Sequence, residues 1–283
     1  MYCLKNNLLF TFLCMFFLVF ASVAIQAESK KKSPKKSSKK TTKTVSKNAE
    51  LVIDASTGKI LHQVNANAKR YPASLTKLMT LYLTFESLKK NEIRLNEKAV
   101  VSKHASAQQR MKLDLKQGEK VSIQTLINSL VVLSANDSAV VLAEKIGGSE
   151  YKFAVLMTSR ARALGMKNTT FKNASGLFDP NQITTAHDMA ILMQAIKKDF
   201  PEYYNMLSAL HFTYDGTEYY SHSNVMKVYS WAKAGKTGYI RASGFNLVIG
   251  AQKKDQNIVA VVMGGATAKI RDDKMIKLLD KFL

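Results

Sequence analysis

Cysteine is almost absent from this chain. The sequence has 283 residues and two cysteines, Cys3 and Cys14, both inside an apolar N-terminal segment. The remainder therefore has no thiol with which to build a disulfide, a thiolate metal site or a cysteine nucleophile. Its stability must come from packing, for which a composition of 46% apolar residues is sufficient.

Patterns typical of metal sites and of carboxylate catalysis are missing as well. None of the five histidines has a second histidine four residues further on, so we interpret each as structural or surface. They are His62, His104, His187, His211 and His222. No carboxylate pair is indicated either. We therefore expect no bound metal and no cofactor.

The first 27 residues are typical of a secretory signal peptide. Lys5 supplies positive charge, residues 8–24 are almost wholly apolar, and small residues stand at Ala24 and Ala27. A retained membrane anchor is the alternative, because the apolar run approaches the roughly 20 residues that span a bilayer. Either way the sequence predicts an exported protein, in the periplasm or at the outer face of the cytoplasmic membrane.

A lysine-rich segment at 28–48 is predicted to be a disordered linker, because it has no apolar periodicity. It contains nine lysines; with these removed from the net +21, and with Lys5 set against Glu28, +12 remains on residues 49–283. Its lysines are Lys30, Lys31, Lys32, Lys35, Lys36, Lys39, Lys40, Lys43 and Lys47. No aromatic residues stand between them, so we do not expect nucleic-acid binding. The expected partner is an anionic envelope polymer or membrane surface.

Residues 49–283 carry the periodicity of a folded domain. Alternating runs predict strands at 51–55, 59–64, 234–239, 245–252 and 257–265, with Gly58 in the first turn. Helical spacing predicts helices from near Ser74 and at 122–133, 139–146, 151–164, 185–198, 203–210 and 270–282. Strands at both ends with helices between them predict one α/β or α+β domain, whose sheet is assembled from distant parts of the chain.

Three polar motifs interrupt these apolar elements. Ser74 and Lys77 stand three residues apart and so share one face of a helix, where a lysine of lowered pKa could act as the base for a serine. Helix capping is the alternative role for Ser74. Ser134 and Asn136 separate two apolar helices, and Asn136 or Asp137 could cap the second of them.

The third motif is Lys236-Thr237-Gly238 in a predicted strand. There the ammonium and hydroxyl groups could bind a carboxylate, while glycine lets a substrate backbone approach closely. Each motif is common alone. Their order, with separations of about 60 and 100 residues, resembles the penicillin-recognising serine acyltransferases.

A longer resemblance narrows this family. From about residue 50 to 283 the chain resembles the exported low-molecular-mass serine D-alanyl-D-alanine carboxypeptidases. The matching stretches are IDASTGKIL, PASLTKLMT, LSANDSA, ALGMKNTTF, GL...TTAHDMA, GKTGY...SGFNLV and VVMGGAT...R. The resemblance implies a β-lactamase-like fold, with a five-stranded antiparallel sheet, flanking helices and a mainly helical subdomain. It also implies that residues 49–283 act on peptidoglycan stem peptides ending in D-Ala-D-Ala, and are inhibited covalently by β-lactams.

The same resemblance implies a role for each matching residue. Ser74 is then the nucleophile, Lys77 its general base and Ser134 a proton shuttle. Backbone N–H groups of Ser74 and Tyr239 would form the oxyanion hole. The implied substrate-binding residues are Asn136, Lys236, Thr237, Gly238, Tyr239 and Arg271. For Arg271, a surface position at the start of the last helix is the alternative.

Three other functions stay open from the sequence. Many family members continue into a β-rich domain and an amphipathic anchor, whereas this sequence ends at Leu283 as the shorter D,D-endopeptidases do. A β-lactamase is less favoured, since residues 165–190 contain only Asp179 and Asp188 as acids. A non-catalytic envelope-binding protein that uses the lysine-rich segment is the third alternative.

Overall fold

The computed structural model describes residues 48–283. The expected signal peptide at 1–27, and the expected linker at 28–48 apart from its last residue, lie outside the described residues. Within 48–283, no helix combines the length and the apolar character that crossing a bilayer requires.

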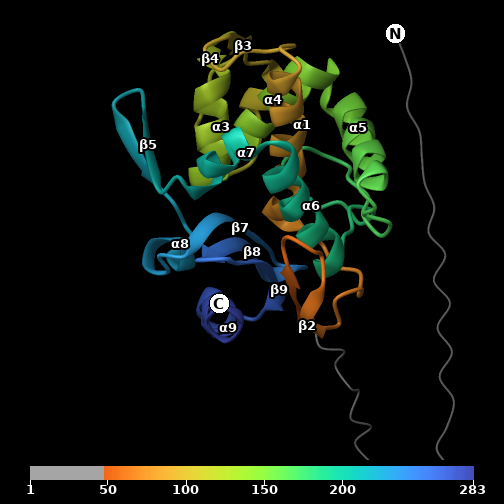
Figure 1. Ribbon diagram of the computed structural model, residues 1–283. Coiled ribbons are helices and arrows are strands. Elements are labelled where there is room, and N and C mark those ends of the chain that lie inside the picture. The colour runs from red at the N-terminus through yellow and green to blue at the C-terminus, as the bar shows by residue number, and fades with distance from the viewer. Residues whose placement is uncertain (1–47) are drawn as a thin grey trace, which may run out of the picture. The chain divides into compact units, whose positions relative to one another are not determined.

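Five strands form one antiparallel sheet in the order β2-β1-β9-β8-β7 (Figure 1). The strands are β1 (Ala49–Asp54), β2 (Ile60–Val64), β7 (Ala232–Ile240), β8 (Gly244–Lys253) and β9 (Gln256–Gly265). The predicted turn between β1 and β2 is confirmed, with Gly58 at φ 75°. Because β1 pairs with β9, the two ends of the domain are joined in one sheet, as the sequence predicted.

Both faces of the sheet are covered, which explains the alternation in its strands. On β9, Ile258, Ala260 and Val262 pack with one cluster, together with helix α9 (Ala268–Phe282). Their neighbours Val259 and Val261 belong to the other cluster, with helix α6 (Ala186–Asp199) and the remaining helices. Successive side chains of a strand point to opposite faces, so one apolar run supplies both cores. Figure 1 shows α9 below the sheet and α6 above it.

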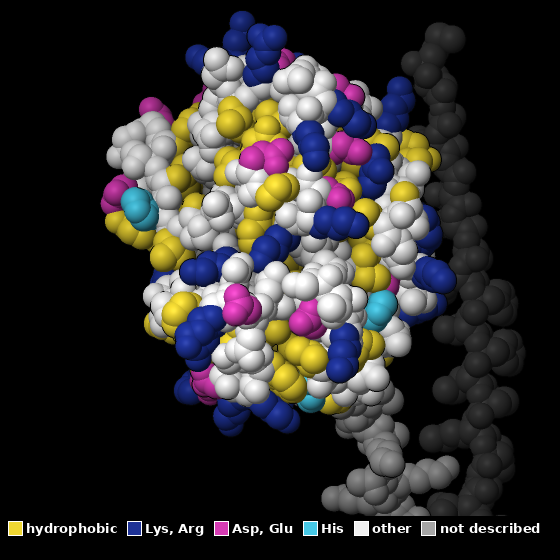
Figure 2. Space-filling model, viewed as in Figure 1, with side chains coloured by type: hydrophobic (Ala, Val, Ile, Leu, Met, Phe, Trp, Pro, Cys, Tyr) yellow, Lys and Arg dark blue, Asp and Glu magenta, His cyan; other side chains and the backbone are white. Residues whose placement is uncertain are grey.

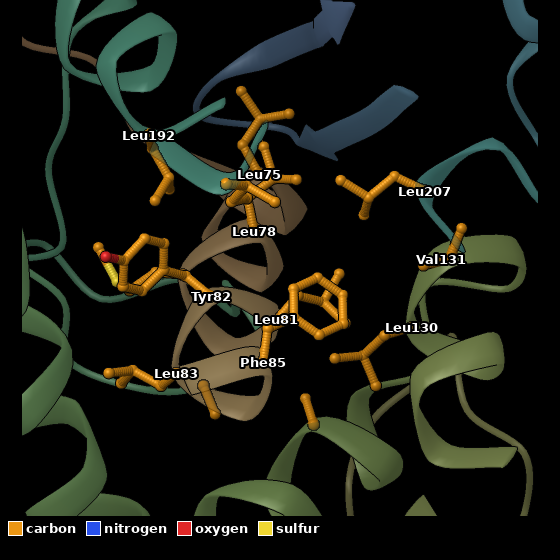
Figure 3. Close-up of a cluster of buried hydrophobic side chains, with 14 of the residues drawn as sticks. Leu75, Leu78, Leu81, Tyr82, Leu83, Phe85, Leu130, Val131, Leu192 and Leu207 are labelled. Atoms are coloured by element: carbon orange, nitrogen blue, oxygen red, sulfur yellow. The ribbon is translucent and has the colours of Figure 1, made fainter. Parts of the chain in front are cut away.

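The helical part surrounds one central helix, α1 (Lys77–Lys89), which follows a 3₁₀ turn, η1 (Ala73–Thr76). Figure 3 shows apolar side chains from α1 meeting neighbours on several sides. The helical spacing of its apolar residues indicates one buried face, whereas nearly all residues of α1 are buried. Its neighbours include α3 (Ile123–Val132), α4 (Asn136–Gly147) and α5 (Glu150–Ala163).

The long helices lie close to their predicted positions, and the short elements were not predicted. The predicted helix at 203–210 is two short turns, α7 (Pro201–Tyr204) and η2 (Asn205–Ser208). Elements of three to five residues show no measurable periodicity. Those missed are α2 (Lys103–Ser106), α8 (Asn224–Val228), β3 (Lys98–Val100), β4 (Lys120–Ser122), β5 (His211–Tyr214) and β6 (Thr217–Tyr220).

The charge of the folded part is spread over its surface. Figure 2 shows Lys and Arg side chains across the whole visible face, with acidic side chains between them. The visible face therefore lacks the single basic stripe that is typical of nucleic-acid binding.

The loop between α5 and α6 packs tightly against η1 through Gly176. This glycine has φ +89°, and a Cβ atom there would lie 1.9 Å from the Ala73 carbonyl oxygen. Both the backbone conformation and the space thus require glycine. The contact fixes the loop against the turn that carries Ser74.

We predict that Gly176→Ala destabilises the protein far more than Gly118→Ala. Gly118 has φ +83° with nothing within 4 Å of its Cβ position, so it reports the backbone strain alone, about 1 kcal/mol. Gly176→Ala adds a backbone clash and should cost at least about 3 kcal/mol, or about 6–12 °C in Tm. Thermal unfolding of both variants is the measurement. Equal losses in the two would contradict the close contact.

Candidate active site

Ser74 lies in the 3₁₀ turn η1 and does not cap a helix. Thr76 is the N-cap of α1, Pro72 is the N-cap of η1, and neither makes a side-chain capping hydrogen bond. The capping alternative for Ser74 is therefore wrong. Its hydroxyl instead lies 3.3 Å from the Lys77 Nζ atom, because a position three residues later returns to the same side.

Lys77 is fully buried, and its amine contacts three oxygens. Nζ lies 2.7 Å from Asn136 Oδ1 and 2.5 Å from the carbonyl oxygen of Ser175, in addition to Ser74 Oγ. A neutral amine has two N–H donors and one lone pair. It can donate to the amide and the carbonyl while it accepts a hydrogen bond from the Ser74 hydroxyl. This arrangement suits a base that removes the serine proton.

The surroundings of Lys77 also favour its neutral form. Burial holds the pKa of Lys77 well below its ordinary value, and the nearby positive charge of Lys236 lowers it further. Asp137 acts in the opposite direction. Its carboxylate accepts hydrogen bonds from the backbone N–H groups of Leu113, Leu115 and Ser138.

Ser134 and Asn136 lie at the break between α3 and α4. Ser134 has φ 64°, a left-handed conformation that turns the chain sharply between the two helices. Asn136 is the first residue of α4, and Ala135 is the N-cap, so capping by Asn136 or Asp137 is wrong. The Asn136 amide spans the site instead. Its Oδ1 accepts from Lys77, and its Nδ2 donates to the Gln109 carbonyl at 2.9 Å.

Lys236 reaches the same place from the sheet. It is 2% exposed on β7, and its Nζ donates to Ser134 Oγ at 3.0 Å and to the Thr237 carbonyl at 3.1 Å. Burial, with the positive charge of Arg271, lowers the pKa of Lys236 to about 7. The three motifs of the sequence thus meet, since Ser74–Lys77, Ser134–Asn136 and Lys236 form one chain of contacts.

Gly238 allows β7 to pass directly beside η1. A Cβ atom at Gly238 would lie 3.1 Å from the Ser74 backbone nitrogen and 3.0 Å from that of Leu75. A larger residue would push the strand away from the turn. Tyr239 follows on β7, 53% exposed, and its ring stacks on Phe245 with centroids 4.3 Å apart.

Arg271 is 4% exposed, so its surface alternative is wrong. It lies in the first turn of α9, and its guanidinium donates twice to Asp272 Oδ1, at 2.9 and 2.7 Å. Its remaining face lines the same cavity as Ser74 and Thr237. A buried, prepositioned guanidinium there is suited to bind an anion.

Several of these residues, Ser74 and Arg271 among them, line a cavity of about 410 Å³, which we call the main cavity. Its lining comprises Ser74, Arg110, Met111, Ser134, His222, Thr237, Gly238, Tyr239, Phe245, Ala268 and Arg271. None of these is a carboxylate. A larger cavity, about 730 Å³, borders α6 and lacks the serine and lysine of the motifs. We therefore place the candidate site in the smaller one.

Sequence reasoning missed His222 and the Ser175 carbonyl. We interpreted His222 as structural or surface, whereas it also lines the main cavity, where burial and the positive charges of Lys236 and Lys227 lower its pKa. A lone histidine has no sequence pattern that places it there. Ser175 contributes its backbone carbonyl, which every residue has, so its side chain gave no clue. The neighbouring Gly176 was the only sequence feature that marked this loop. Within 48–283, no three His, Cys, Asp or Glu side chains gather as metal ligands would.

Comparisons with known proteins agree with this geometry. The family model described as D-alanyl-D-alanine carboxypeptidase matches residues 34–267. The D-alanyl-D-alanine carboxypeptidase DacC of Escherichia coli (strain K12) is 36% identical over 238 residues, which cover 82% of this chain. DacF of Bacillus subtilis (strain 168) is 33% identical over 239 residues, 81% of this chain. The chain spans about 60% of the length of these curated relatives.

Solved structures share the fold. Penicillin binding protein 5 from Haemophilus influenzae is 33% identical and superposes with a TM-score of 0.79. The superposition covers 82% of this chain and 69% of that one. Penicillin-binding protein D2 from Listeria monocytogenes, solved in an ampicillin-bound form, is 28% identical, with a TM-score of 0.71 and coverage of 82% and 95%. By its family match and these likenesses, the chain belongs to the D-alanyl-D-alanine carboxypeptidase family of serine peptidases.

Proposed function

We propose that this chain is an exported serine D,D-carboxypeptidase that removes the terminal D-Ala from peptidoglycan stem peptides. The observation that carries the proposal is the fully buried Lys77 amine, 3.3 Å from the Ser74 hydroxyl and held by Asn136. Family membership supports the same reaction. Residues 49–283 form the catalytic domain in this proposal, and 1–27 direct its export to the periplasm or the outer face of the membrane.

Acylation begins when the Ser74 hydroxyl attacks the carbonyl carbon of the penultimate D-Ala. Lys77, in its neutral form, accepts the hydroxyl proton as the new C–O bond forms. The carbonyl oxygen becomes an oxyanion. Backbone N–H groups of Ser74 and Tyr239 stabilise it, and the close passage of β7 along η1 at Gly238 supports this pairing.

The tetrahedral intermediate then collapses and breaks the peptide bond. The leaving amine of the terminal D-Ala takes a proton from the Ser134 hydroxyl, which is replenished by the protonated Lys77. The contact between Ser134 and Lys236 supports this role, because the ammonium orients the hydroxyl. Free D-Ala leaves, and Ser74 carries the acyl group as an ester until water hydrolyses it and the proton returns to the serine.

Three side chains bind the carboxylate of the terminal D-Ala in this proposal. Lys236 offers its ammonium, Thr237 its hydroxyl and Arg271 its guanidinium. The burial of both cations supports it, because a carboxylate gains more from a charge that water does not screen. Asn136 additionally donates to a substrate carbonyl.

β-Lactams are expected to acylate the same serine and to stay attached. The Listeria monocytogenes relative solved with ampicillin supports this expectation. No carboxylate lines the main cavity among the described residues, so the acyl group lacks the acidic side chain that would activate water for its removal. The lysine-rich segment at 28–48 would hold the domain near anionic envelope polymers or the membrane surface.

Ser74→Ala is predicted to abolish the covalent penicillin adduct completely, since it removes the attacking oxygen. Intact-protein mass spectrometry after incubation with penicillin measures the adduct. Ser230→Ala, an exposed serine outside the cavity, should retain it. An adduct that persists in Ser74→Ala would contradict the assignment, and rapid loss of the adduct from the parent protein would favour a β-lactamase.

A digest of purified cell-wall peptides separates the two peptidase functions. We expect free D-Ala from stem peptides that end in D-Ala-D-Ala, with cross-linked peptides left largely intact. Liquid chromatography and mass spectrometry quantify both products. Cleaved cross-links without release of D-Ala would show a D,D-endopeptidase instead.

Both buried lysines should shape the pH dependence of kcat/KM. Lys77 must be neutral, so activity should rise as pH increases through its lowered pKa. Lys236 must be an ammonium, so activity should fall as pH increases above its pKa of about 7. Lys236→Arg should remove the falling limb, because a guanidinium stays charged, and lower the maximal rate about tenfold.

The matched control for this profile is Lys233→Arg, an exposed lysine on the same strand. Its pH–rate profile should match that of the parent protein. A falling limb that survives unchanged in Lys236→Arg would show that another group controls it.

A further inference from the structure

A second cavity lies just beyond the main cavity along β7. Its volume is about 400 Å³, and Phe178, Ile240, Arg241 and Ala242 line it. We call it the Arg241 cavity. Resting on the proposed function, we propose that it binds the side chain of the substrate residue that precedes the D-Ala-D-Ala pair, and that it favours an aliphatic chain ending in a carboxylate.

Both walls of the Arg241 cavity are fixed to the turn that carries Ser74. On one side, Ile240 follows two residues after Gly238, whose Cβ position lies 3.1 Å from the Ser74 nitrogen. On the other side, Phe178 follows two residues after Gly176, which packs against Ala73. The cavity is therefore held at a constant position relative to the serine.

The Phe178 ring is additionally held by an aromatic contact. It packs edge-on against Tyr71, with ring centroids 5.3 Å apart, yet it remains 58% exposed. An exposed aromatic ring in a fixed position offers apolar area at little cost in conformational entropy. It can cover the methylene groups of a long side chain.

The course of β7 places the correct substrate residue beside this cavity. The groups proposed for the terminal carboxylate, Lys236 and Thr237, come first on β7, Ile240 ends the strand, and Arg241 follows it in the turn. β7 is the edge strand of the sheet, so an extended peptide can lie along it. Such a peptide advances about 3.3 Å per residue. The residue before the D-Ala-D-Ala pair therefore lies past Tyr239, at the Arg241 cavity.

The charge of this cavity is positive and unpaired. Arg241 is exposed and makes no ion pair or side-chain hydrogen bond with any residue of 48–283. The nearest acid along the chain from Phe178 is Asp179, whose Oδ1 accepts from the Asn181 N–H at 2.7 Å. A guanidinium above apolar walls suits a ligand whose aliphatic part ends in a carboxylate, with which it can form a bidentate pair.

The test uses two soluble peptides, acyl-X-D-Ala-D-Ala, that differ only at the end of the X side chain. X is 2-aminopimelic acid, which ends in a carboxylate, or 2-aminoheptanoic acid, which ends in a methyl group. Release of D-Ala gives kcat/KM for each peptide. We expect the parent protein to favour the carboxylate peptide about fivefold, which is the range of a partly exposed charge pair.

Variants then connect the preference to Arg241. Arg241→Gln should lower the ratio of the two kcat/KM values to about one, and Arg241→Glu should invert it. Lys233→Gln removes an exposed cation from β7, outside the cavity, and should keep the parent ratio. Thermal unfolding of each variant checks that the fold is retained.

The outcomes separate this subsite from the proposed function. Hydrolysis of both peptides at equal rates by the parent protein would overturn the subsite alone, as would an unchanged ratio in Arg241→Gln. A failure of the parent protein to release D-Ala from either peptide would overturn the proposed function, and the subsite with it.

Discussion

The burial of two lysine amines in one crevice is the constraint on which the rest of this site depends. Placing a charged ammonium out of water costs several kcal/mol unless it is paired or loses its proton. Lys77 has no carboxylate in direct contact within the described residues, and Lys236 lies close enough to oppose its charge. The folded chain therefore favours a neutral Lys77, which is the form a general base requires.

The free-energy cost of burying these two lysines must be offset by packing and hydrogen bonds around them. α1 supplies the packing, because apolar side chains pack around this helix on several sides (Figure 3). Lys77 is its first residue. The amide of Asn136 and the carbonyl of Ser175 meet the polar needs of the amine. The strain at Ala73 and Ser134, both at positive φ, is offset by this packing.

Strands, long helices and the three motifs could be predicted because each leaves a periodic or local pattern. The left-handed turn at Ser134 and the close contact of Gly176 with Ala73 depend on packing against distant segments. A pattern within one sequence does not record such packing. The resemblance singled out Arg271, but its burial could not be predicted, because it depends on the position of α9 under the sheet. His222 lines the main cavity just before α8, a helix too short to predict from periodicity, so its place could not be predicted either.

The pairing of β1 with β9 has a consequence for timing. The first strand of the sheet, β1, pairs along its whole length with the last, β9, which lies about 200 residues later in the chain. Contacts of such large sequence separation form late in folding. A ribosome-bound chain that still lacks β9 cannot join β1 to β8 and close the sheet, so β7 lacks its final support beside η1. Lys236 on β7 therefore reaches Ser134 in its final position only when synthesis is essentially complete, so an unfinished chain lacks the assembled crevice.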